Sequence, residues 1–248
     1  MRAIVGSCVV VFLAGSALGQ SPEPPLSNAR LAVATLLRED VFAGWMENDM
    51  DRYVRGENNI DLLLEQRPRS RAELLAWKGG TRLYRAVLAS EAGMSEEFER
   101  QYQETLDLFA EARKLGPKHP AVAAIVGGSY VVFADRLPEK YREAAWSESY
   151  SNYQILWQLQ GGAVDRLPVH IRGELLAGLA QSTERTGRNT ECDEYLEKII
   201  KLLPDTGYER VAKEWKADRL AAKSSNISCK SCHAAGRLAE RIAAIESK

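Results

Sequence analysis

The sequence contains few of the residues that mark the more specialised classes of protein. Its 248 residues include four cysteines, too few for a disulfide-stapled scaffold of this size. With 18 glycines and 9 prolines, the composition is neither collagen-like nor typical of a many-stranded β protein. Lys and Arg number 33 against 34 Asp and Glu, so the positive excess of a nucleic-acid binder is missing. Apolar residues make up 45% of the chain, which excludes disorder and leaves a globular protein.

The first part of the chain has the order of features of a secretory signal peptide. Arg2 supplies a positive charge, residues 3–18 form an uncharged apolar run, and Ala17 and Gly19 are the small residues of a cleavage site. The run is shorter than the roughly 20 residues of a membrane-spanning helix. We therefore expect residues 1–19 to be removed, Cys8 with them. Residues 20–30 would then form an exposed linker. The mature protein has no second long apolar run, so we expect no membrane span and a periplasmic or otherwise exported location.

The apolar residues of the remaining chain recur at helical spacing. Leu74, Trp77, Leu83 and Val87 lie on one helical stripe, and Phe98, Tyr102, Leu106 and Phe109 lie on another. The alternation typical of strands is almost absent. The periodic segments are separated by helix breakers: Gly93, Gly116-Pro117, Leu137-Pro138, Gly161-Gly162, Gly187 and Pro204. The sequence therefore predicts an all-α fold.

Part of this helical body resembles the tetratricopeptide repeat. After Gly187, a small residue at Cys192 and apolar residues at Leu196 and Ile199 stand where that family places them in its second helix, and Pro204 follows. Two further segments repeat the pattern and also end at prolines: Ile60 and Leu63 precede Pro68, and Phe109, Ala112 and Leu115 precede Pro117. The prolines lie 49 residues apart (68 to 117) and then 87 (117 to 204), unlike the family period of roughly 34. The resemblance implies stacked antiparallel helical hairpins over residues 31–218, with an irregular helical bundle as the alternative.

A motif near the C-terminus points to a specific chemistry. Residues 229–233 read Cys-Lys-Ser-Cys-His, the pattern of covalent haem attachment. Thiols at this spacing can form thioethers with the two vinyl groups of the porphyrin, and the adjacent imidazole can bind the iron. A thioredoxin-like pair would need a βαβ context, a zinc site would need further ligands, and a disulfide would leave His233 unexplained. We expect one covalent haem c, held by Cys229 and Cys232, with His233 as the proximal iron ligand.

In this motif the chain resembles the c-type cytochromes. Their commonest layout has a ligating Met downstream, whereas no Met or His follows His233 here. The arrangement is closer to the cytochrome c′ type, in which the motif opens the last helix of a bundle and the sixth iron position is empty. We expect residues 219–248 to form the attachment segment and a final helix, with Leu238, Ile242 and Ile245 on its apolar stripe.

A sixth iron ligand would have to come from the helical body. The candidates are His119, His170, Met46, Met50 and Met94. We favour His170, because it opens the helix that pairs with the helix of Cys192, and these elements are nearest in sequence to the motif. A first-turn surface histidine is the equal alternative. We expect His119 to lie in an exposed turn, the methionines to fill the core and Cys192 to be buried and inert. Trp215 could line one side of the porphyrin or belong to the core.

Three functions fit these features. The first is an electron-transfer protein whose helical repeats dock a redox partner protein. The second is a five-coordinate haem protein that binds or senses small gases. The third is a protein-docking scaffold with an accessory haem. No catalytic set stands out, so we expect no enzyme, although peroxidase-like activity stays open. Covalent haem and a balanced charge favour electron transfer, with no nucleic-acid partner.

Overall fold

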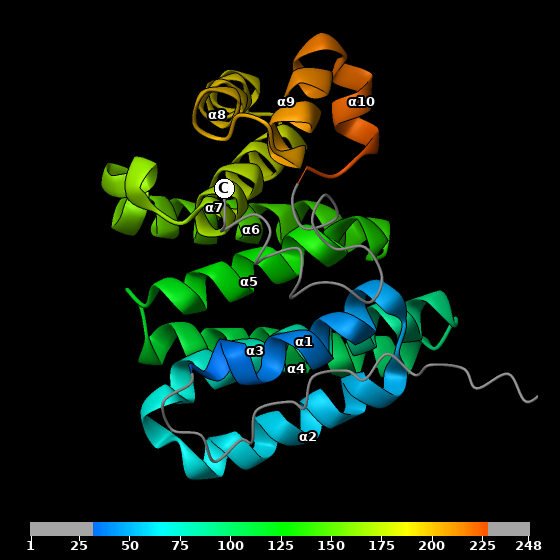
Figure 1. Cartoon of the computed structure of the whole chain (residues 1–248). Helices are drawn as coiled ribbons and strands as arrows, with labels where there is room; N and C mark the ends of the chain where they lie inside the picture. Colours follow the sequence, from blue (N-terminus) through cyan, green and yellow to red (C-terminus); the bar gives the residue numbers. More distant parts are fainter. Residues whose placement is uncertain (1–31, 228–248) are drawn as a thin grey trace, which may run out of the picture.

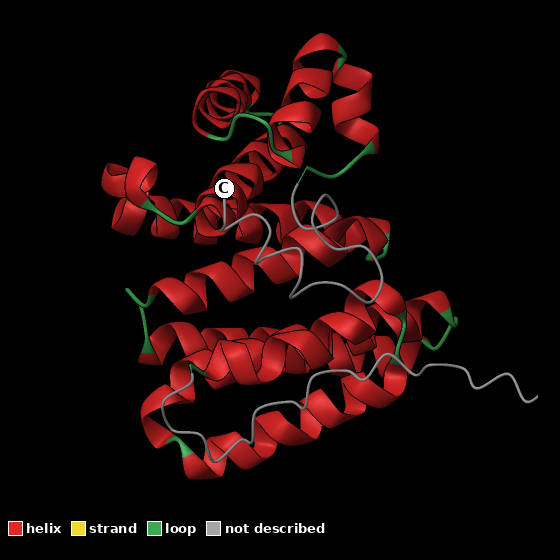
Figure 2. Cartoon of the chain, viewed as in Figure 1, coloured by secondary structure: helices red, strands yellow, loops and turns green. Residues whose placement is uncertain are grey.

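The computed structural model describes residues 32–227, in which all regular structure is helical (Figure 2). The helices are α1 (Val33–Glu47), α2 (Met50–Gln66), α3 (Arg71–Glu91), α4 (Ser95–Leu115), α5 (Pro120–Phe133), α6 (Glu139–Gln160), α7 (Val169–Arg185), α8 (Asn189–Leu202), α9 (Gly207–Ala217) and α10 (Arg219–Ser224), with short 3-10 turns η1 (Pro68–Ser70), η2 (Ala134–Arg136) and η3 (Gly161–Arg166). The all-α prediction is confirmed. The expected signal peptide and linker, the haem motif and the stripe of Leu238, Ile242 and Ile245 lie outside the described residues.

Consecutive helices pack as hairpins, and the hairpins follow one another through the molecule. The pairs are α1–α2, α3–α4, α5–α6, α7–α8 and the short α9–α10. Contacts of α2 with α3, α3 with α5, α6 with α7 and α8 with α9 join each pair to the next. In Figure 1 the order runs from the blue and cyan helices at the bottom to the orange helices at the top. The predicted stacking of helical hairpins is therefore confirmed.

The predicted helix breakers lie between helices, each for a local reason. Gly93 and Gly187 have φ values of 72°, a left-handed conformation that glycine adopts without strain. Pro68, Pro117 and Pro204 each come within two residues after the second helix of a hairpin. Proline lacks the backbone N–H that would continue the helical hydrogen bonds, so each of these helices ends before it.

The helix lengths explain why the prolines do not follow a regular period. Helices α3 and α4 have 21 residues each, which lengthens the hairpin that ends before Pro117. The interval from Pro117 to Pro204 spans two hairpins, α5–α6 and α7–α8, the first with a 22-residue helix followed by η3. Hairpins of unequal length therefore produce the irregular spacing.

The predicted apolar stripes form the core. Leu74, Leu83 and Val87 of α3 are fully buried, as is Phe109 of α4. Leu115 falls at a core place in the repeat pattern, but it is the last residue of α4 and is 51% exposed. A helix end has no following turn to cover its final side chain, so the pattern fails at that position.

The last described residues pack onto the hairpin stack. Helix α10 contacts α9 and α7, and Ile227 after it is fully buried. Asp218, between α9 and α10, caps α10 by accepting a hydrogen bond from the backbone N–H of Leu220 at 2.8 Å. Within residues 32–227 no helix combines the length and the apolar character that a membrane span requires.

Candidate functional site

An apolar cavity of about 410 Å³ lies among α1, α3, α5, α6 and α7. Its walls are mostly aromatic and aliphatic side chains, with a few polar groups among them. The lining residues are Ala34, Phe42, Trp45, Glu73, Trp77, Pro120, Ala121, Ala124, Ile125, Gly128, Ser129, Val132, Tyr153, Leu156, Gln160, His170, Ile171, Glu174 and Leu175. Concave apolar spaces of this size with few polar groups are typical of cofactor and ligand sites.

Small residues on one side of α5 leave this space open. Ala121, Ala124 and Gly128 recur at a spacing of three to four residues, so they lie on one face of the helix. All three are partly exposed, although α5 carries no charged residue between Pro120 and Phe133. A Cβ atom added at Gly128 would meet only the Tyr153 hydroxyl, at 3.6 Å. The side chains on this face are therefore too small to fill the volume beside them.

His170 is one of the residues that line the cavity, and one nitrogen of its ring has no hydrogen-bond partner among the described residues. It is the second residue of α7, and its Nδ1 atom is buried without a hydrogen-bond partner in the described part of the chain. Trp45 Nε1 and Gln160 Oε1, from two other walls, are in the same condition among residues 32–227. Buried polar atoms are nearly always paired in native proteins, so this concentration around one cavity indicates a site for a bound group.

Two carboxyl groups also line the cavity. Burial raises the pKa of Glu73 above its ordinary value, and the nearby charge of His119 opposes this shift. Glu174 accepts a hydrogen bond from the hydroxyl of Tyr208 on α9 at 2.9 Å. The polar groups of the cavity therefore include a histidine and two carboxyls set in apolar walls.

A close helix contact fixes one wall of the cavity. Tyr153 of α6 is 2% exposed, and its ring lies against Gly178 of α7, where a Cβ atom would overlap the ring. We expect Gly178→Ala to lower the free energy of unfolding by about 1–3 kcal/mol, the usual cost of overpacking, despite alanine's better helix propensity. Urea unfolding would measure this change. Gly162→Ala is the control, because its Cβ would meet nothing within 4 Å, and equal stability losses in both variants would contradict the prediction.

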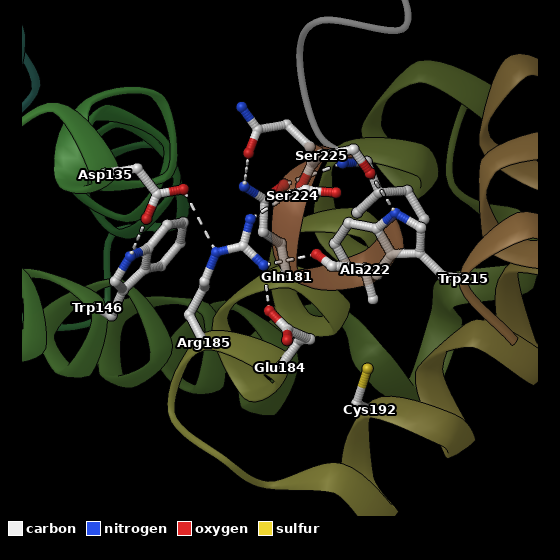
Figure 3. A network of polar contacts seen from close by, with 12 residues as sticks. Asp135, Trp146, Gln181, Glu184, Arg185, Cys192, Trp215, Ala222, Ser224 and Ser225 are labelled. Atoms are coloured by element: carbon white, nitrogen blue, oxygen red, sulfur yellow. Dashed lines mark hydrogen bonds and ion pairs between the residues drawn. The ribbon is translucent and has the colours of Figure 1, made fainter. Parts of the chain in front are cut away.

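The chain that leads to the Cys-x-x-Cys-His motif is held against α7 (Figure 3). Gln181 Oε1 accepts a hydrogen bond from the backbone N–H of Ile227 at 3.1 Å, and Gln181 Nε2 donates to Asn226 Oδ1 at 2.5 Å. Cys229 is two residues beyond Ile227, so the backbone can separate the two residues by at most about 7 Å. Cys229, Cys232 and His233 themselves lie outside the described residues, and the structure says nothing of their positions.

The face of α7 that holds this segment also carries His170. Positions 170, 174 and 181 lie four and eleven residues apart, about one and three helical turns, so they share one side of the helix. At 1.5 Å per residue, His170 is about 16 Å along α7 from Gln181. The six residues from Ile227 to His233 can span up to about 20 Å. The motif is therefore within chain reach of the cavity.

The other residues singled out in the sequence lie elsewhere. His119 is exposed at the N-terminus of α5. Met46 and Met50 pack against the core as expected, whereas the expectation is wrong for Met94, which stands at the N-cap position of α4 and is 52% exposed. None of the four lines the cavity. Trp215 is fully buried in α9 and donates from Nε1 to Ser225 Oγ at 2.8 Å, which gives it a core role.

Cys192 is buried as expected. Its side chain has no exposed surface, and Arg219 Nη1 lies 3.7 Å from the sulfur. Burial raises the pKa of the thiol, with Arg219 opposing the shift. A buried thiol with a raised pKa is poorly reactive, so the structure offers no chemistry for Cys192.

Sequence reasoning did not identify the walls of the cavity or the residues that hold the chain before the motif. Helix α5 gave one signal, since residues 120–133 are apolar on every side and carry small residues at helical spacing. Gln181 and Arg185 gave none, because polar residues near the end of a helix are usually solvated. Within residues 32–227 there is also no group of three or more His, Cys, Asp or Glu side chains that could hold a metal ion.

Comparison with known proteins adds no family to these observations. No family model matches the chain, and neither the curated proteins nor the solved structures gave a match.

Proposed function

We propose that this protein is an exported monohaem c-type cytochrome that transfers electrons. Cys229 and Cys232 hold the porphyrin through thioethers, and His233 binds the iron. Haem supplies one-electron chemistry at its iron. The expected redox partner is a protein that docks on the helical hairpins.

The observation that carries the proposal is that the residues just before the motif are bound to α7. Ile227, two residues before Cys229, is bound to the same face of α7 that carries His170, and His170 lines an apolar cavity. The cavity residues suit a porphyrin, because apolar and aromatic walls exclude water from the ring. Trp45, Trp77 and Phe42 supply broad apolar surfaces, and a buried imidazole nitrogen has no partner among the described residues.

His170 is the candidate for the second iron ligand. The unpartnered Nδ1 atom of its imidazole is available to bind a metal, and we assign this role to it. Glu73 and Glu174 place carboxyl groups in the same walls. In its ionised form, either carboxyl would favour the more positively charged, oxidised state of a nearby redox centre.

The test is an absorption spectrum of the protein produced together with haem-attachment machinery, with the mass of the denatured protein measured on the same sample. We expect a haem that stays on the denatured chain, with sharp reduced bands and no response to CO. Cys229→Ala/Cys232→Ala is expected to lose all covalently bound haem and to keep the helical fold. Cys192→Ala is the matched control, expected to retain haem because Cys192 is buried and is not part of the motif.

Each other outcome has a definite meaning. No covalent haem in the unaltered protein contradicts the proposal and leaves a helical docking scaffold. A broad spectrum that shifts with CO would favour gas binding over electron transfer, and it would show that His170 does not bind the iron.

A further inference from the structure

We infer that Gln181 and Arg185 of α7 form a clamp on residues 222–227, and that this clamp sets where the haem-bearing motif begins. The inference rests on the proposed function and adds two positioning residues to it. Neither side chain lines the cavity, so both would act through the chain segment that they hold.

Arg185 holds the end of α10 through main-chain atoms (Figure 3). Its Nη1 donates to the carbonyl oxygen of Ala222 at 2.7 Å, and its Nη2 donates to the carbonyl oxygen of Ser225 at 2.8 Å. The last carbonyls of a helix have no partner within the helix, so the guanidinium satisfies groups that α10 leaves open. Contacts to the main chain fix the path of the segment itself.

The surroundings of Arg185 hold the guanidinium in place. Its Nε donates to Asp135 Oδ2 at 3.3 Å, and Glu184 forms a second ion pair with it. The rings of Trp146 and Trp215 lie 5.5 and 6.0 Å from its guanidinium carbon. The side chain is only 10% exposed, and charge-assisted hydrogen bonds are stronger where water is excluded.

Gln181 continues the clamp one turn of α7 away from Arg185. Its side chain is fully buried, and its amide binds both Asn226 and the main chain of Ile227. A buried amide that donates one hydrogen bond and accepts another at successive residues fixes the register of the segment. Because Gln181 shares its face of α7 with His170, a change in this register would move the motif relative to the cavity.

Arg172 offers a matched control on the same helix. It also donates to two main-chain carbonyls, that of Leu202 at the end of α8, at 2.8 Å, and that of Leu167 just before α7, at 2.9 Å. Arg172→Gln should therefore remove similar hydrogen bonds without touching residues 222–227. Arg185→Gln and Gln181→Met remove the clamp from its two sides.

The experiment compares these three variants of the haem-loaded, full-length protein. We expect all three to carry covalent haem by mass. In Arg185→Gln and Gln181→Met, a displaced motif should weaken the bond between His170 and the iron, so added imidazole should compete better and bind about 10-fold more tightly than in the unaltered protein. This is the lower end of the roughly 10- to 100-fold loss of metal affinity that follows when supporting partners are removed. The reduction potential should shift in the same two variants. Arg172→Gln should match the unaltered protein in both readouts, and Arg185→Lys should recover part of the change.

Two results would overturn the inference. One is an unaltered spectrum, potential and imidazole affinity in both clamp variants. The other is the same shift in Arg172→Gln, which would reflect a general loss of stability. The reduction potential is measured on every sample. The test therefore works whether the iron of the unaltered protein has five ligands or six.

Failure of the proposed function would give a different result, since the unaltered protein would then carry no covalent haem. The clamp would in that case be tested by measuring how fast a thiol reagent labels Cys229 and Cys232. These rates should rise in Arg185→Gln and stay unchanged in Arg172→Gln, because only the first loss frees the segment before the motif. Equal rates in the two variants would overturn the clamp.

Discussion

Replacing His170 with alanine is expected to convert a low-spin haem into a high-spin haem that binds CO. His170 is the histidine that the described structure places in the cavity wall, with Nδ1 lacking a partner there. Without its imidazole, the side of the iron opposite His233 would have no strong protein ligand. Axial ligation is among the main factors that set haem spectra and potentials, so the effect should be complete rather than partial.

The absorption spectra of oxidised, reduced and CO-treated protein would measure this change. His119→Ala is the matched control, because His119 is exposed and does not line the cavity. Covalent haem should remain in both variants, since the thioethers do not involve either histidine. A His170→Ala protein with an unchanged low-spin spectrum would show that another group binds the iron.

Ala124→Phe is expected to change stability in opposite directions in the haem-free and haem-loaded proteins. Ala124 lies on the small-residue face of α5, beside the cavity. In the haem-free Cys229→Ala/Cys232→Ala background, the added ring can fill apolar space and raise the free energy of unfolding by about 1.5 kcal/mol. In the loaded protein it would compete with the porphyrin and lower that free energy by about 1–3 kcal/mol, as overpacking does.

Denaturant unfolding of the haem-free and haem-loaded proteins would measure the free energy of unfolding in each, and so the direction of each change. Ala110→Phe serves as the control, because Ala110 lies exposed on α4 and the same added ring there meets no cavity. We expect it to have little effect in either background. Stabilisation by Ala124→Phe in both backgrounds would mean that the porphyrin lies elsewhere.

The helical hairpins were predictable because their signals are local. Each proline and glycine break acts on its own few residues, through a missing N–H at Pro117 or a left-handed φ at Gly187. Apolar stripes such as that of Phe98, Tyr102 and Phe109 needed only the helical period to be recognised, and all three are buried. Where the pattern failed, at Leu115, the reason was the end of a helix, which periodicity does not mark.

The candidate site was only partly predictable. The Cys-x-x-Cys-His motif is readable from five adjacent residues, and proximity along the chain was enough to nominate His170. The cavity was not readable, since its walls come from five helices and from residues as far apart as Ala34 and Leu175. The clamp was hidden for the same reason, because Gln181 and Ile227 are 46 positions apart.

The sequence by itself determined the helical class, the hairpin boundaries and the prediction of covalent haem, because each depends on neighbouring residues and on short-range backbone chemistry. Only the tertiary structure decided that His170 lines an apolar cavity and that Arg185 and Gln181 hold the chain before the motif. Both features depend on how the hairpins stack, and stacking is set by the summed shape of buried side chains, such as Tyr153 against Gly178. No single stretch of sequence contains that information.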